Sequence, residues 1–138
     1  MQLISYLHFN GNCRQAFEFY NAVLGGNIVA TVTYGDMPGP EPCPEATRNL
    51  VAHVRLIVGD AVLMGSDSPP EMYGKPDGLS ITLMADNVED ADRLYTGLSD
   101  GGNVFMPIQE TSWAERFGMF TDKFGIPWMV CFEKPRSS

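Results

Sequence analysis

Apolar positions follow the same order twice along the chain. In the first series, residues 5–9 form a mostly apolar run, and apolar side chains then recur at helical spacing: Ala16, Phe19, Tyr20, Val23 and Leu24. Asn12 precedes the helical positions as a candidate N-cap with Gln15 at the capping-box position, and Gly25 and Gly26 follow them. The pattern predicts a strand, a capped helix and a further strand.

The second series repeats the first after a shift of 75 positions. This shift aligns Ser5 with Ser80 and keeps several other residues identical: Asn12 and Asn87, Ala16 and Ala91, Tyr20 and Tyr95, Gly26 and Gly101, and Val29 and Val104. Residues 81–85 are again apolar, and Asn87 is again followed by a helical series and a glycine pair. The two series therefore indicate an internal duplication.

A closing segment completes each half. Residues 59–64 align with residues 125–130 after a shift of 66, and each segment predicts a turn and a final strand. Residues 35–49 contain four prolines, which exclude a helix or a central strand and indicate an inserted loop. Residues 67–77 contain three further prolines and form the predicted linker between the halves.

These elements predict an α+β fold. Each half consists of a strand, a helix and three strands, so we expect one domain over residues 1–138 that contains two βαβββ modules. The first module covers residues 1–66 and includes the insertion at residues 35–49. The linker covers residues 67–77, and the second module covers residues 78–138.

Composition and charge narrow the range of partners. The chain has 138 residues, with 17 Asp and Glu against 9 Lys and Arg, so its formal net charge is −8. This charge disfavours nucleic acid and anionic membranes, which attract basic proteins. No apolar run approaches the length of about 20 residues that spans a bilayer, and the N-terminal segment does not resemble a signal peptide. The three cysteines are odd in number, as expected for reduced thiols in a cytoplasmic protein.

Several longer motifs resemble a known superfamily. The motifs FNGNCRQAFEFYNAVLGG (residues 9–26) and TDKFGIPWMVCFE (residues 121–133) are similar to those of the vicinal oxygen chelate superfamily. That superfamily includes glyoxalases, bleomycin-resistance proteins, fosfomycin-resistance enzymes and extradiol dioxygenases. The segment QETSWAERFGMFTDKFGIPW and the insertion GDMPGPEPCPE resemble its PhnB-like branch. The resemblance implies curled mixed sheets that form a cleft, and a homodimer.

The resemblance also implies positions for a divalent metal. In the superfamily, His on the first strand and Glu on the last strand of a module hold the metal. The first-strand positions fall on Ser5 and Ser80, and the last-strand positions on Leu63 and Met129. Hydroxyl, isobutyl and thioether groups are poor ligands for such a cation, so we expect no metal site and no cofactor.

Some PhnB-like relatives carry the label demethylubiquinone methyltransferase. The present chain has no glycine-rich strand-to-helix turn of the kind that binds a nucleotide-like cofactor, and it is too short for a separate cofactor domain. We therefore do not expect methyl transfer.

The two histidines offer limited alternatives. His8 lies three positions after Ser5, so strand alternation predicts that it faces the helix rather than the cleft. His53 lies in the predicted third strand, and the sequence leaves open whether it lines the cleft as an acid, base or ligand.

Residues other than the histidines are also candidates for a functional site. Glu110 is a candidate general base and Trp113 can stack on a ligand, but these residues could also belong to a turn and a subunit interface. Cys13 lies beside Arg14, which could lower the pKa of the thiol, but we expect Cys13 to serve as a small apolar core residue. Trp128 is expected to pack beneath a helix.

Three functions remain open. The first is metal-independent binding of an apolar or aromatic small molecule, with or without catalysis, in a cleft lined by Ser5, Leu7, Phe9, Leu63, Ser80, Thr82, Trp113 and Met129. The second is a metal-dependent lyase, transferase or dioxygenase that uses unusual ligands such as His53 and Glu110. The third is a structural or regulatory homodimer whose cleft is filled by its own side chains.

Overall fold

The computed structural model describes residues 1–37 and 44–135. The chain divides into two compact units, Met1–Gly74 and Lys75–Ser138. The predicted insertion at residues 35–49 falls partly outside the described residues, because residues 38–43 are not among them.

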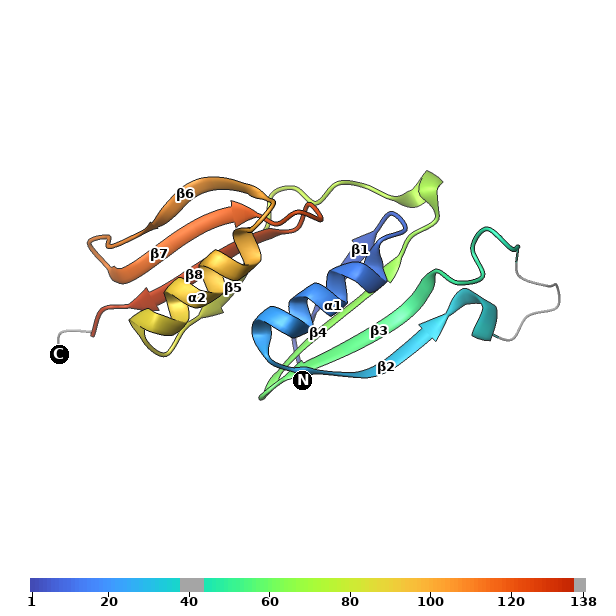
Figure 1. Ribbon diagram of the computed structural model, residues 1–138, viewed down its shortest axis with the longest axis horizontal. Helices are drawn as coiled ribbons and strands as arrows, with labels where there is room; N and C mark the ends of the chain where they lie inside the picture. Colours follow the sequence, from blue (N-terminus) through green and yellow to red (C-terminus); the bar gives the residue numbers. More distant parts are fainter. Residues whose placement is uncertain (38–43, 136–138) are drawn as a thin grey trace. The chain divides into compact units, whose positions relative to one another are not determined.

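The first unit contains a mixed four-stranded sheet and one long helix (Figure 1). Its elements in chain order are β1 (Ser5–Phe9), α1 (Cys13–Leu24), β2 (Asn27–Thr33), the 3₁₀ turn η1 (Tyr34–Asp36), β3 (Val51–Val58), β4 (Ala61–Asp67) and the 3₁₀ turn η2 (Pro70–Met72). The strand order is β1-β4-β3-β2, with β1 parallel to β4 and the remaining pairs antiparallel. Asp67, which we expected in the linker, is therefore the last residue of β4.

The second unit has the same topology. Its elements are β5 (Ile81–Met84), α2 (Val88–Ser99), β6 (Asn103–Gln109), β7 (Ala114–Thr121) and β8 (Pro127–Glu133), and the strand order is β5-β8-β7-β6. Only the β5–β8 pair in this sheet is parallel. The predicted α+β fold with two βαβββ modules is confirmed.

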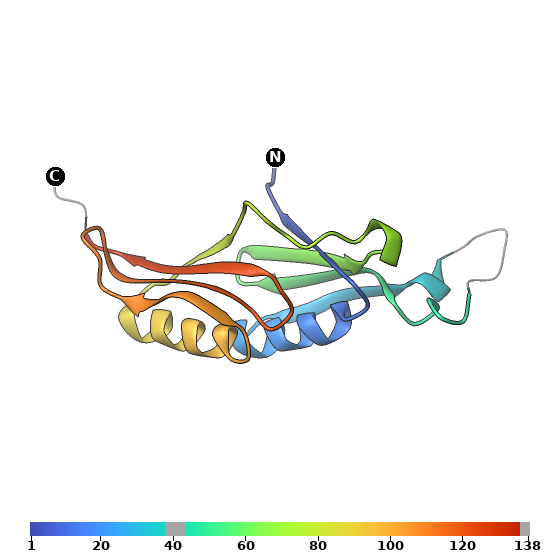
Figure 2. The same ribbon diagram turned by 90° about the horizontal axis from the view of Figure 1, so that it is seen from above.

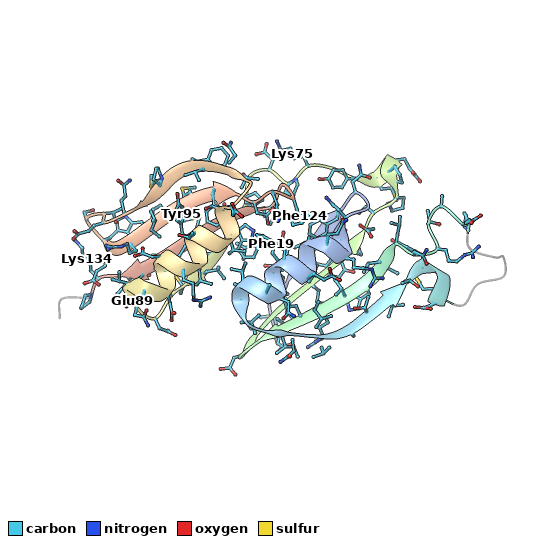
Figure 3. The ribbon with its side chains drawn as sticks, viewed as in Figure 1. Phe19, Lys75, Glu89, Tyr95, Phe124 and Lys134 are labelled. Atoms are coloured by element: carbon cyan, nitrogen blue, oxygen red, sulfur yellow. The ribbon has the colours of Figure 1, made fainter. Side chains whose placement is uncertain are left out.

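In each unit the helix covers one face of the sheet (Figure 2). Phe17 of α1 is buried and meets Phe9 of β1 edge to face, with ring centroids 6.1 Å apart. A side chain at Gly65 of β4 would collide with Phe17, because its Cβ would lie 2.6 Å from the ring. In the second unit, Tyr95 of α2 packs against Phe120 of β7 (Figure 3).

The two helices begin differently. The side chain of Asn87 accepts a 2.8 Å hydrogen bond from the Asp90 amide, so it caps α2 as predicted. Asn12 occupies the N-cap position of α1, but its side chain makes no capping bond. The predicted N-cap position is therefore correct, but the expected side-chain bond is absent. The carboxylate of Asp67 accepts the amide of Cys13, the first residue of α1, at 2.9 Å. Across the described residues, no helix has the length and apolarity needed to cross a bilayer.

Candidate functional site

Each sheet has one face that its own helix leaves uncovered. In the first unit this face carries Tyr6 and His8 of β1, His53 and Arg55 of β3, and Met64 and Ser66 of β4; we call it the first open face. In the second unit it carries Thr82, Met106, Phe117, Met119, Met129 and Cys131; we call it the second open face. Strand alternation assigns these residues to the side opposite the helix contacts described above.

The residues predicted to line a cleft in the first unit lie on the helix-covered face. Leu7 and Phe9 are buried, and Phe9 contacts Phe17 of α1. Leu63 is also buried and pairs with Ser5, which places both residues on the helix side of the sheet. The expected placement of Ser5, Leu7, Phe9 and Leu63 in a cleft is therefore wrong.

Both histidines lie on the first open face, so the prediction that His8 faces the helix is also wrong. The hydroxyl of Tyr6 lies 3.2 Å from Nδ1 of His53, and the two rings stack with centroids 5.8 Å apart. The Tyr6 ring also contacts the His8 ring, with centroids 5.2 Å apart. The only two imidazoles in the chain thus contact the same phenol.

A one-residue shift between the duplicated halves explains these errors. The helices match at the predicted shift, since α1 covers Cys13–Leu24 and α2 covers Val88–Ser99. In the strands, helix-facing Leu7 corresponds to helix-facing Leu83 rather than to Thr82, because Leu83 pairs with the buried Val130. Successive residues of a strand point to opposite faces, so an alignment error of one residue exchanges the two faces. The alignment of Ser5 with Ser80 is wrong by one residue in the strands, and it therefore assigned Ser5 and its neighbours to the wrong face of the first sheet.

The candidates in the second unit lie on its open face. Thr82 and Met129 are paired across β5 and β8, and the Thr82 hydroxyl approaches the Met129 sulfur at 3.8 Å. Met129 also pairs with Met119 of β7. Ser80 is exposed and precedes β5 with the same alternation as Thr82. The structure therefore places Thr82 and Met129 on one face, next to the exposed Ser80.

Trp113 extends this apolar surface. Its ring meets Phe117 edge to face at 4.7 Å, and its side chain is 50% exposed. Phe117 belongs to a buried cluster with Ala114 and Cys131, against which Met106, Met119 and Met129 pack. Phe117 and Met119 are not among the residues predicted to form the site, although alternation along β7 could have indicated both.

Trp128 lies on the opposite face, as predicted. It is 1% exposed and pairs with Phe120, which contacts α2. Its indole Nε1 donates a 2.8 Å hydrogen bond to the buried carboxylate of Asp122. The two tryptophans therefore lie in different environments: Trp128 is buried beneath α2, and Trp113 is half exposed on the other face.

Glu110, which we considered as a general base, is part of an ion pair. Its carboxylate lies 2.7 Å from Nζ of Lys134, which follows β8 (Figure 3). The hydrogen bond and charge of Lys134 lower the pKa of Glu110, so this carboxylate is ionised at neutral pH. The neighbouring turn is fixed by Thr111, whose hydroxyl accepts the Ala114 amide at 3.0 Å. Catalysis by Glu110 or His53 stays a prediction.

Comparison with known proteins identifies the family. The family described as 3-demethylubiquinone-9 3-methyltransferase matches residues 1–131. The chain is also 34% identical to protein YjdN of Escherichia coli K12 over 138 residues, with 94% of each chain covered. The chain belongs to this family.

Two solved structures share the fold of this chain. Protein PA1353 from Pseudomonas aeruginosa is 45% identical, with a TM-score of 0.88 over 98% of this chain and 99% of that one. The PhnB protein from Bacillus cereus, described as a putative 3-demethylubiquinone-9 3-methyltransferase, is 22% identical with a TM-score of 0.79 over 96% and 99% of the chains. The family match over residues 1–131 confirms the family, and the structure of the PhnB protein shows that it shares the fold implied by the resemblance.

The donor groups on the second open face do not fit the His and Glu ligand set that the resemblance implies, and the strands of the first open face offer two imidazoles without a carboxylate. The second open face offers a hydroxyl, thioethers and the Cys131 thiol, whose pKa is raised by burial and by the charge of Glu133. Within residues 1–37 and 44–135, no three His, Cys, Asp or Glu side chains are grouped closely enough to hold a metal ion. The homodimer and the cytoplasmic location stay predictions.

Cys13 provides a test of the packing beneath α1. The residue is fully buried, and burial together with the charge of Asp67 raises the pKa of its thiol to about 12. Cys13 is therefore an apolar core residue, as expected, and Arg14 does not activate the thiol, because its lowering effect on the pKa is the smallest of the three.

We expect Cys13 and Cys131 to resist modification in the native protein. At pH 8, a thiol with a pKa of about 12 is ionised in about one molecule in 10,000. A Cys43→Ser variant, which removes the cysteine outside the described residues, should react with Ellman's reagent only after denaturation in guanidinium. Release of one equivalent of chromophore within minutes from the native variant would contradict this prediction.

Proposed function

We propose that this protein binds a small apolar or aromatic molecule on the second open face. The observation that supports the proposal is the group formed by Thr82, Met129 and Trp113 with Phe117 and Met119 on one side of the sheet. Thioethers and aromatic rings suit a flat apolar ligand, since methionine adapts its shape and aromatic pairs favour edge-to-face or offset contacts. The Thr82 hydroxyl supplies a polar group at the edge of this surface.

Binding is favoured over methyl transfer because the chain has no glycine-rich strand-to-helix turn of the kind that binds a nucleotide-like cofactor. The segment that leads into α1 is instead held by the Asp67 carboxylate, which accepts the amides of Gly11 and Cys13.

The proposal can be tested with N-phenyl-1-naphthylamine, a neutral aromatic probe whose emission rises in apolar surroundings. We expect saturable binding, with Trp113→Ala and Met129→Gln each weakening the affinity about three- to tenfold, because each removes an aromatic or apolar contact with the probe. Met72→Ala is the matched control, since Met72 is 75% exposed and lies in η2 of the first unit.

The outcomes distinguish the three candidate functions. Unchanged affinity in both Trp113→Ala and Met129→Gln would contradict a ligand site on the second open face. Binding that disappears after EDTA treatment and returns with added Mn²⁺, Ni²⁺ or Zn²⁺ would favour the metal-dependent alternative. A protein that shows no saturable binding would favour the structural or regulatory role.

A further inference from the structure

We propose that the first open face holds a second, separate site that binds the oxyanion of a small molecule, either a carboxylate or a phosphate. The groups that would bind it are the guanidinium of Arg55, the Tyr6–His53 pair and the imidazole of His8. These residues belong to the first unit and share no side chain with the apolar surface around Trp113. The inference is therefore independent of the function proposed for the second unit.

The charge on this face is opposite to the charge of the chain. The protein has a net charge of −8, yet by strand alternation none of the strand residues on this face is Asp or Glu. Asp67 ends β4 on the other side, where its carboxylate accepts the amides of Gly11, Cys13 and Val51. The first open face thus combines a cation with neutral donors and has no strand carboxylate to compete with a ligand.

Arg55 is the permanent charge of this face. It lies on β3, where it pairs with Met64 on one side and Ala30 on the other, and its side chain is half-buried. Among the residues that the structure describes, Arg55 has no carboxylate within ion-pair distance. A half-buried guanidinium without a protein counterion favours a planar oxyanion, which it can bind with two parallel hydrogen bonds.

The Tyr6–His53 pair retains an outward donor in either protonation state. When His53 is neutral and Nδ1 accepts the Tyr6 hydroxyl, the ring proton remains on Nε2. When His53 is protonated, Nδ1 donates to the phenol oxygen, and both Nε2 and the Tyr6 hydroxyl can donate to a ligand. Oxyanions accept hydrogen bonds and do not donate them, so they match this pair in both states.

A cavity adjoins the His8 end of this group. Its volume is about 360 Å³, and its lining includes His8, Ser66, Asp67, Ser68, Tyr34 and Met72. The carboxylate oxygens of Asp67 are occupied by backbone amides. This volume is in the range of pockets that accommodate small molecules. Ser66 of β4 pairs with His8 of β1. On its other side, the register of β3 and β4 continues from the pair Val54 and Gly65, which places His53 beside Ser66. A ligand could therefore place its anionic group near the histidines and its remaining atoms in the cavity.

The histidine content makes the site directly observable. Because His8 and His53 are the only histidines, the proton NMR spectrum of the imidazole Cε1–H groups contains two resonances, which single His→Gln variants assign. Titration with benzoate or phenyl phosphate at pH 7.5 should shift both resonances with saturation. Benzamide, which has the same ring without the charge, should not shift them, and the two anions distinguish a carboxylate site from a phosphate site.

Substitution of Arg55 tests the assignment of the charge. Arg55→Gln should weaken binding of the preferred anion about tenfold or more, because it removes a charge-assisted bidentate contact. Arg93→Gln is the matched control, since Arg93 lies on α2 in the second unit beside Asp90. Far-UV circular dichroism would confirm that both variants are folded.

Three results would overturn the inference. The first is equal binding of benzamide and benzoate, which would show that the ring rather than the charge is recognised. The second is unchanged anion affinity in a folded Arg55→Gln variant. The third is the absence of saturable histidine shifts with either anion.

Discussion

Replacement of Asp67 by alanine should reduce the free energy of unfolding by about 4 kcal/mol, the largest effect expected from a single substitution in the first unit. Asp67 is 1% exposed, and its two carboxylate oxygens accept three backbone amides from two separate segments. The distances are 3.0 Å from Gly11, 2.9 Å from Cys13 and 2.9 Å from Val51. The carboxylate therefore joins the end of β4 to the start of α1 and to the start of β3.

The magnitude follows from the donors that the substitution leaves behind. Alanine offers no acceptor, so three amides at or near the interior lose their partner, at a cost of about 1–3 kcal/mol for each buried donor. Because partial access of water relieves some of this cost, a total near 4 kcal/mol is expected, which is a large part of the stability of a typical domain. Urea unfolding followed by far-UV circular dichroism measures the change.

Asp36→Ala is the matched control for this substitution. Asp36 is exposed and accepts one backbone amide, that of Thr33, at 3.2 Å. Its replacement should change the unfolding midpoint far less than Asp67→Ala does. If the two variants unfold at the same urea concentration, Asp67 does not have the structural role described here. Asp67→Asn, which retains one acceptor oxygen, should lie between wild type and Asp67→Ala.

Asp122→Ala should produce the second largest loss, about 3 kcal/mol, in the other unit. Asp122 is 3% exposed and accepts the amides of Phe124 at 2.8 Å and Ile126 at 3.1 Å. It also accepts the indole Nε1 of Trp128 at 2.8 Å. The substitution therefore breaks the β7–β8 turn and leaves the donor of a buried tryptophan without its charged acceptor.

Tryptophan emission measures the effect of Asp122→Ala, because Trp128 passes from a buried to an exposed environment on unfolding. The unfolding transition in urea should move to a lower concentration, and a Trp113→Phe background removes the contribution of the exposed indole. Asp77→Ala is the control, since Asp77 is exposed and its side chain accepts the amide of the adjacent Gly78. A midpoint for Asp122→Ala that equals the Asp77→Ala midpoint would contradict the role assigned to Asp122.

The order of the elements could be predicted from the sequence because it depends on local signals. Helical spacing after Asn12 and Asn87, and glycine pairs after Leu24 and Ser99, define the two helices at the shift of 75 positions. The burial of Trp128 beneath α2 was also predictable, because it alternates with its neighbours in the closing strand. Each of these signals lies within a few residues of the feature that it predicts.

The faces of the strands were harder to predict because one residue of shift reverses them. In the second unit the selected Thr82 and Met129 lie on the open face, whereas in the first unit Leu7 and Phe9 lie under α1. The role of Asp67 was also hidden, since its three partners are distant in the sequence. A carboxylate next to a proline-rich segment indicates a loop by local criteria, and only the tertiary structure shows that it is buried.

The central claim is that ligand binding takes place on the open face of the second sheet. NMR of protein labelled with ¹³C at the methionine methyl groups tests this claim most directly, because Met106, Met119 and Met129 share that face. On titration with N-phenyl-1-naphthylamine, these three methyl resonances should shift together with one affinity, while those of the exposed Met1 and Met72 stay in place. Saturable shifts confined to methionines outside the second open face would contradict the account.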